Sequence, residues 1–147
     1  MEKMAAPSTK IVSMTVTEKG YSQDQVTGDI NFNDEAVKHD LANIGTPKTC
    51  IGYIVSALSV RKEAGAKSFT VMSCDNLQAN GEMTKKLVLQ FANKLNPDLA
   101  TWIEANTLFP NSMVDRITPR CSQETKDFIK DTYKLEDASP VKSEEFI

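Results

Sequence analysis

KSFTVMSCDNLQANGEMTKKLVLQFANKL, residues 67–95, contains a strand, a turn and a helix in immediate succession. The first eight residues predict a strand. After the turn DNLQANG, apolar residues share one face of a helix: Met83, Leu87, Val88, Phe91 and Leu95. The stretch therefore predicts a strand that leads directly into an amphipathic helix.

A second strand and helix precede this stretch. Residues 11–17, IVSMTVT, are rich in β-branched types and stop at EKGY, and their near-continuous apolar character predicts a strand buried on both faces. The polar stretch up to about residue 45 holds at most a short helix, which Asp34 would cap. Thr46 and Pro47 then predict a helix start, and apolar residues repeat with helical spacing until Gly65: Cys50, Ile51, Ile54, Val55 and Leu58.

The remaining sequence continues this alternation. Asn96 and Pro97 predict the start of a short helix that carries Leu99, Trp102 and Ile103, and TLFP, 107–110, predicts a third strand. A last helix is expected to start at Ser122 and to bury Phe128, Ile129 and Tyr133. Alternating strands and helices favour an α/β fold with a parallel sheet, because parallel strands need a crossover between them.

Composition sets limits on the class of protein. The 147 residues are 40% hydrophobic and 25% charged, which is ordinary for one globular domain. The formal net charge of -3 and the lack of a basic run argue against a nucleic-acid partner. The sequence shows neither a secretory signal nor a bilayer-spanning stretch, so we expect a cytoplasmic protein without membrane contact.

Metal binding and thiol catalysis find little support in the sequence. The three cysteines are far apart and form no CxxC pair, so we expect three reduced thiols and no zinc site. His39 is the only histidine and has no second ligand at metal-binding spacing, which favours a solvated surface residue. Cys74 lacks a histidine that could act as its base, so burial as a small apolar group suits it better.

Polar residues gather where each predicted strand ends. They are Thr17, Glu18, Lys19, Gly20 and Tyr21 after the first strand, Ser73 to Asn76 after the second, and Asn111, Asp115 and Arg116 after the third. Each group has a simple structural interpretation: a solvated carboxylate at Glu18, turn formers at Asp75 and Asn76, and an ion pair of Asp115 with Arg116. Because parallel sheets bind ligands beyond the carboxyl ends of their strands, the shared position favours a site.

The same three motifs carry a family resemblance. TVTEKGY (15–21), SCDNLQANG (73–81) and FPNSMVDRITP (109–119) together resemble the polyol-specific long-chain dehydrogenases, the mannitol 2-dehydrogenase and fructuronate reductase family. DLANIGTPKTCIGYIVSAL (40–58) and VKSEEFI (141–147) are similar to stretches found in the same order in that family. The likeness covers nearly the whole chain.

The resemblance implies an NAD-dependent oxidoreductase that interconverts a polyol and a ketose, such as mannitol and fructose, without a metal. Asn76 would be the catalytic amide that hydrogen-bonds the reacting oxygen, and Asp115 and Arg116 would contact the substrate. Thr17 and Glu18 would bind the cofactor, and Glu18 would lie near both the nicotinamide and the substrate. Whether the substrate is a neutral sugar or a sugar acid, and whether the cofactor is NAD or NADP, stays open.

The resemblance further implies that residues 1–147 form the later half of a dinucleotide-binding domain, a partial Rossmann-like sheet, with the family's C-terminal helical domain absent. No two of the six glycines are separated by a single residue, so the glycine-rich phosphate loop is missing, and so is the lysine base. In the family the first strand of the sheet normally lies beside the strand that residues 11–17 would form. Without that first strand, residues 11–17 would be an apolar edge through which the chain could associate. This leaves an alternative: a non-catalytic remnant or interaction module. An unrelated α/β binding domain is a more distant possibility.

Overall fold

The computed structural model describes residues 1–145, with the side chain of residue 18 excepted. Phe146 and Ile147, the end of the VKSEEFI motif, lie outside the described residues. The chain divides into two compact units, unit 1 (Met1–Met113) and unit 2 (Val114–Ile147). Within residues 1–145, no helix combines the length and the apolarity that crossing a bilayer requires.

Unit 1 is built on two parallel strands. After the short helix α1 (Glu2–Ala5), β1 (Ile11–Met14) pairs with β2 (Thr70–Ser73), so that Ile11 faces Thr70 and Met14 faces Ser73. The crossover between them contains a 3-10 helix, η1 (Glu18–Tyr21), and two α-helices, α2 (Glu35–Ala42) and α3 (Cys50–Glu63). α4 (Asn80–Leu95) and α5 (Pro97–Asn106) follow β2. The order confirms the predicted α/β class with a parallel sheet.

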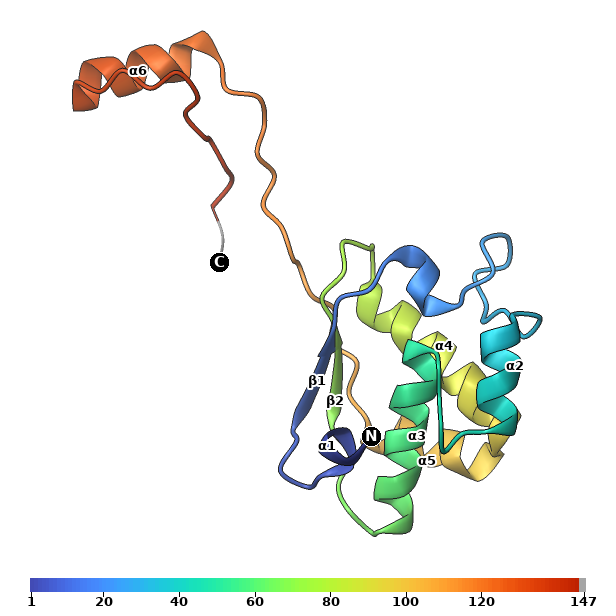
Figure 1. Cartoon of the computed structure of the whole chain (residues 1–147). Helices are drawn as coiled ribbons and strands as arrows, with labels where there is room; N and C mark the ends of the chain where they lie inside the picture. The colour runs from blue at the N-terminus through green and yellow to red at the C-terminus, as the bar shows by residue number, and fades with distance from the viewer. Residues whose placement is uncertain (146–147) are drawn as a thin grey trace. The chain divides into compact units, whose positions relative to one another are not determined.

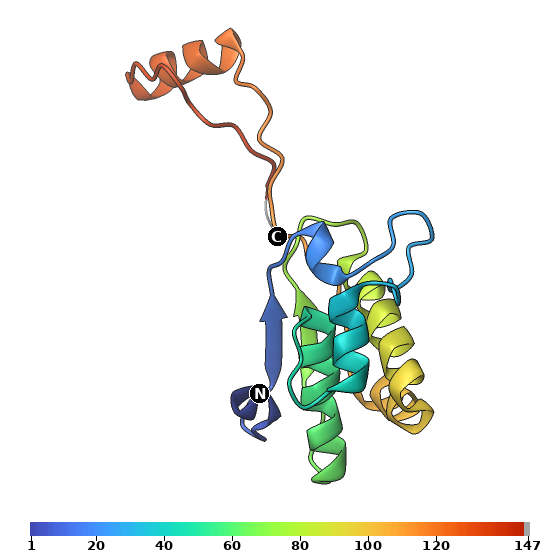
Figure 2. The ribbon, with the colours of Figure 1, turned by 45° about the vertical axis from the view of Figure 1, so that its right-hand side comes forward.

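The helices α3, α4 and α5 lie on the same side of the two strands (Figure 1), and the turned view agrees (Figure 2). Their apolar residues form the core with one face of the sheet, where Met14 and Val71 are buried. Ile11, at the start of β1, keeps 57% of its surface exposed. The prediction that residues 11–17 form a strand buried on both faces is therefore wrong, because helices cover only one face and β1 ends at Met14.

Helix starts follow local capping chemistry, and one differs from its prediction. Asp34 caps α2 and Asn96 caps α5, as the sequence indicates. α3 is capped by Thr49, whose hydroxyl accepts from the Gly52 amide at 2.9 Å, and the predicted start at Thr46 and Pro47 is wrong. The physical reason lies in Asp40, whose buried carboxylate accepts from the amides of Lys48 and Thr49 and so fixes the chain ahead of the helix.

The predicted third strand does not form. Residues 107–110 are extended without strand pairing, although the Val71 amide donates to the Leu108 carbonyl at 2.9 Å. The Thr107 amide completes the end of α5 by donating to Ile103, and Pro110 has no amide to donate. One backbone hydrogen bond thus joins residues 107–110 to β2, where the prediction expected a ladder of such bonds.

Unit 2 contains an extended segment and the helix α6 (Gln123–Tyr133), which Ser122 caps as predicted. The Ile117 amide donates to the Glu144 carboxylate at 3.0 Å, which ties residues 114–120 to the segment after the helix. The rings of Phe128 and Tyr133 contact each other edge to face. No α6 residue is buried within unit 2, so unit 2 by itself does not provide the predicted burial of Phe128, Ile129 and Tyr133.

Candidate functional site at the strand ends

A buried polar cluster joins the carboxyl ends of β1 and β2. One carboxylate oxygen of Asp75 accepts from the Val16 amide at 2.8 Å, and the other accepts from the Tyr21 hydroxyl at 2.5 Å. The Tyr21 oxygen also lies 2.5 Å from the Ser73 hydroxyl. Tyr21 and Ser73 are fully buried and Asp75 is nearly so, which makes these bonds costly to break. The predicted meeting of the first two strand ends is therefore confirmed.

The Tyr21 phenol stays protonated in this cluster. Burial, and then its hydrogen bond to Asp75, raise the pKa of Tyr21 to about 12. Because the single phenolic proton goes to Asp75, the Ser73 hydroxyl donates to the Tyr21 oxygen. The hydrogen bonds thus point in one direction: the Ser73 hydroxyl donates to Tyr21, and the Tyr21 hydroxyl donates to the Asp75 carboxylate.

The segment after α5 reaches the same edge of the sheet. The Asn80 side-chain amide donates to the carbonyls of Asp75 and Ser112, each at 3.0 Å, and accepts from the Ser112 amide. The Ser112 hydroxyl donates to the Ser73 carbonyl at 2.5 Å. Asn111 caps α4 from a distance, since its oxygen accepts from the Gly81 amide at 2.9 Å. Three segments that are far apart in sequence therefore meet where the strands end.

Gly81 allows this close approach. A Cβ atom at Gly81 would lie 2.5 Å from the Phe109 carbonyl oxygen and closer still to that of Pro110, both rigid backbone atoms. The residue is buried in the first turn of α4. Only glycine therefore lets residues 109–112 lie against the helix.

We expect Gly81→Ala to lower the free energy of unfolding by about 2 kcal/mol, because inserting a methyl group into a filled space costs about 1–3 kcal/mol. Urea unfolding of residues 1–147 measures the change. Gly45→Ala is the matched control, since a Cβ atom at Gly45 would have no other atom within 4 Å and its backbone angle suits any residue. Equal stability of the two variants would contradict the assigned close contact.

Asn76 and Thr17 are exposed beside the buried cluster. Asn76 lies in the turn between β2 and α4, directly after Asp75, and both it and Thr17 are exposed. Thr17 is the N-cap residue that precedes η1, and its carbonyl accepts from the Gly20 amide at 2.7 Å. Glu18 is the first residue of η1, and its side chain lies outside the described atoms. The roles of these residues toward a ligand stay predictions.

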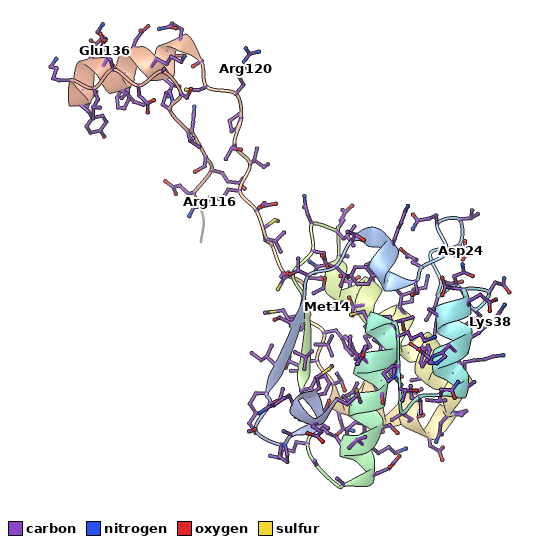
Figure 3. The ribbon with its side chains drawn as sticks, in the orientation of Figure 1. Met14, Asp24, Lys38, Arg116, Arg120 and Glu136 are labelled. Carbon is purple, nitrogen blue, oxygen red and sulfur yellow. The ribbon has the colours of Figure 1, made fainter. Side chains whose placement is uncertain are left out.

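Asp115 and Arg116 belong to unit 2. They are exposed on the extended segment that precedes α6, and Figure 3 labels Arg116 there. Asn76, Thr17 and Glu18 belong to unit 1. The grouping of Asp115 and Arg116 with these residues therefore stays a prediction.

The sequence interpretation missed the buried part of the cluster. Asp75 was expected to form a turn, yet its carboxylate holds the end of β1 and the Tyr21 hydroxyl. A signal existed in SCD, where a carboxylate directly follows a buried strand. The contacts of Asn80 and Ser112 had no such signal, because they depend on where the chain returns after α5.

Comparisons with known proteins agree with this arrangement. The family model described as the mannitol dehydrogenase Rossmann domain matches residues 1–147. D-mannonate oxidoreductase of Escherichia coli strain K12 is 49% identical over 146 residues, which are 99% of this chain and 30% of that protein. Mannitol 2-dehydrogenase of Phaeosphaeria nodorum is 47% identical over 144 residues, 98% of this chain and 25% of that protein.

A solved structure gives the same match. The mannitol 2-dehydrogenase of Pseudomonas fluorescens, solved as a ternary complex with NAD and D-mannitol, is 46% identical with a TM-score of 0.74. The match covers 99% of this chain and 30% of that one. The chain thus spans about a third or less of the relatives that it matches. The predicted resemblance and the Rossmann-like fold are confirmed, and the chain belongs to the mannitol dehydrogenase Rossmann-domain family.

Proposed function

We propose that this chain is part of an NAD-dependent oxidoreductase of the mannitol 2-dehydrogenase type, which oxidises a hexitol to a ketose. The observation that carries the proposal is the 46% identity, over 99% of the chain, with an enzyme solved in complex with NAD and D-mannitol. The strand-end cluster supports it, because ligands of parallel sheets bind at that edge. Since the chain covers 30% of that enzyme, the proposed activity would also need residues outside the matched region.

The residues of unit 1 fit the nicotinamide end of NAD better than its pyrophosphate. A pyrophosphate binds at a helix amino end with unsatisfied amides, but Thr49 and the Asp40 carboxylate occupy the start of α3, and Asn111 caps α4. Thr17 and Glu18 instead follow β1 at the ligand-binding edge of the sheet. We assign these two residues to the nicotinamide side, where NAD would accept the hydride.

In this proposal Asn76 acts on the substrate. Its amide would donate a hydrogen bond to the reacting oxygen and stabilise the negative charge that develops there. Asp115 and Arg116 would bind substrate hydroxyls, since a carboxylate accepts their protons and a guanidinium donates to their oxygens. The proton of the alcohol would pass to a base supplied by the remainder of the enzyme.

A chimeric enzyme tests the proposal. Residues 1–147 replace the matching 30% of the Pseudomonas fluorescens mannitol 2-dehydrogenase, and reduction of NAD is followed with mannitol. We expect mannitol-dependent activity. A chimera that folds but oxidises no polyol would contradict the proposal and would favour the non-catalytic alternative.

A sugar-acid substrate is the second candidate, and the 49% identity to D-mannonate oxidoreductase favours it. The chimera should therefore be assayed with mannonate beside mannitol. Preference for mannonate would move the assignment to a sugar-acid reductase. Preference for mannitol would retain the neutral polyol.

A further inference from the structure

We propose that Asp75 and Tyr21 are positioning residues, which set the distance between the cofactor-side residues Thr17 and Glu18 and the substrate-side amide of Asn76. The inference rests on the proposed function of those three residues. It concerns two buried side chains that would touch neither substrate nor cofactor.

The first step is the placement of the Asp75 contacts along the chain. One carboxylate oxygen holds the backbone of Val16 and the other holds the side chain of Tyr21. Thr17 and Glu18 lie between these two points of attachment. A single carboxylate therefore fixes both ends of the segment 16–21.

The second step is the attachment of Asp75 itself. Its backbone carbonyl accepts from the Asn80 side chain, and the Met14 carbonyl accepts from the amide of Cys74, the residue before it. Asn76 follows directly and is exposed. Movement of the Asp75 carboxylate would therefore shift segment 16–21 and the Asn76 turn relative to each other.

The third step is the role of the Tyr21 hydroxyl. Removing it leaves the Asp75 oxygen without its 2.5 Å donor and leaves the Ser73 hydroxyl with only its longer bond to that oxygen, at 3.4 Å. The aromatic ring would still fill its buried site in Tyr21→Phe. That variant thus tests the hydrogen bonds with little change in packing.

Steady-state kinetics of the chimera give the first test. We expect Tyr21→Phe to lower kcat about tenfold, because a small misplacement of reacting groups costs one to two orders of magnitude. The kinetic isotope effect with deuterated mannitol should rise, since hydride transfer becomes more rate-limiting. Tyr53→Phe is the control, as Tyr53 is 41% exposed on α3. A merely structural role would lower the folded fraction, with kcat per bound NAD and the isotope effect unchanged, and would overturn the proposal.

A double-mutant cycle with Asp75→Asn refines this test. The asparagine side chain can still accept from Val16, but its amide group cannot accept the Tyr21 proton. If the two residues act as one unit, the double variant should be little slower than the slower single variant. If the double variant instead lowers kcat by the product of the two single-variant factors, a shared positioning role is contradicted.

Amide hydrogen exchange tests the positioning role of Asp75 and Tyr21 independently of activity. In residues 1–147, Tyr21→Phe should raise exchange in both segment 16–21 and residues 76–78, whereas Tyr53→Phe should leave both unchanged. An inactive parent chimera would contradict the proposed function alone, and the exchange result would still test the positioning. Exchange at the wild-type rate in either segment of Tyr21→Phe would overturn it.

Discussion

Replacing Asn76 by alanine in the active chimera is expected to lower kcat by about 10²–10³-fold, the usual loss when one hydrogen-bond donor to a developing oxyanion is removed. Asn76 is exposed directly after the buried Asp75, so its amide can face a ligand while the turn behind it stays fixed. The KM for mannitol should change much less than kcat, because the bond strengthens as charge develops on the oxygen. Single-turnover hydride transfer measures the effect.

Gln78→Ala is the matched control for this prediction. Gln78 is also exposed, in the same turn, and its side chain is also an uncharged amide. We expect the control to retain the rate of the parent chimera. If Asn76→Ala and Gln78→Ala oxidise mannitol equally fast, the catalytic role assigned to Asn76 is wrong.

The largest effect on stability is expected for Asp40→Ala, which should lower the free energy of unfolding by about 3 kcal/mol, because several buried donors lose their acceptor at once. The carboxylate is fully buried and accepts from the Lys48 amide at 2.7 Å, from the Thr49 amide at 2.8 Å and from the Thr49 hydroxyl at 2.7 Å. Urea unfolding measures the loss. Asp34→Ala, which removes the cap of α2, should cost only about 1 kcal/mol.

The same carboxylate makes stability depend on acid. Burial alone would raise the pKa of Asp40, but hydrogen bonds from Thr49, His39 and Lys48 outweigh it and hold that pKa below the ordinary value of 3.8. The contribution of the Asp40 carboxylate to the free energy of unfolding is thus complete above pH 3.8. It is lost as the pH falls through the lower pKa that Asp40 has in the folded protein. As the pH is lowered, the free energy of unfolding of Asp40→Asn should fall less steeply than that of the unsubstituted protein. Equal slopes for the two proteins would contradict this assignment.

Much of the fold was predictable because its signals are local. The caps at Asp34 and Asn96 and the apolar faces of α3 and α4 each depend on residues within one or two turns. The start of α3 was missed because Asp40, eight residues before Lys48, fixes the chain there. The strand predicted at 107–110 does not form, because the Thr107 amide donates to α5 and Pro110 has no amide, so neither can join a ladder.

The candidate site was predictable only in outline. Parallel strands place their carboxyl ends together, so Thr17 and Asn76 could be expected on one edge from the order of elements alone. The carboxylate of Asp75 contacts residues 59 and 54 positions away, and no local pattern encodes such pairs. Asp115 and Arg116 were assigned through the resemblance, and their part in the site stays a prediction.

The central claim is that Asn76 contacts the reacting oxygen. A crystal structure of the chimera with NAD and mannitol tests this most directly. We predict that the Asn76 side-chain nitrogen lies about 3 Å from the oxygen of the carbon that is oxidised, the ordinary length of such a hydrogen bond. A complex in which mannitol binds beside the nicotinamide while Asn76 contacts only solvent would contradict the account.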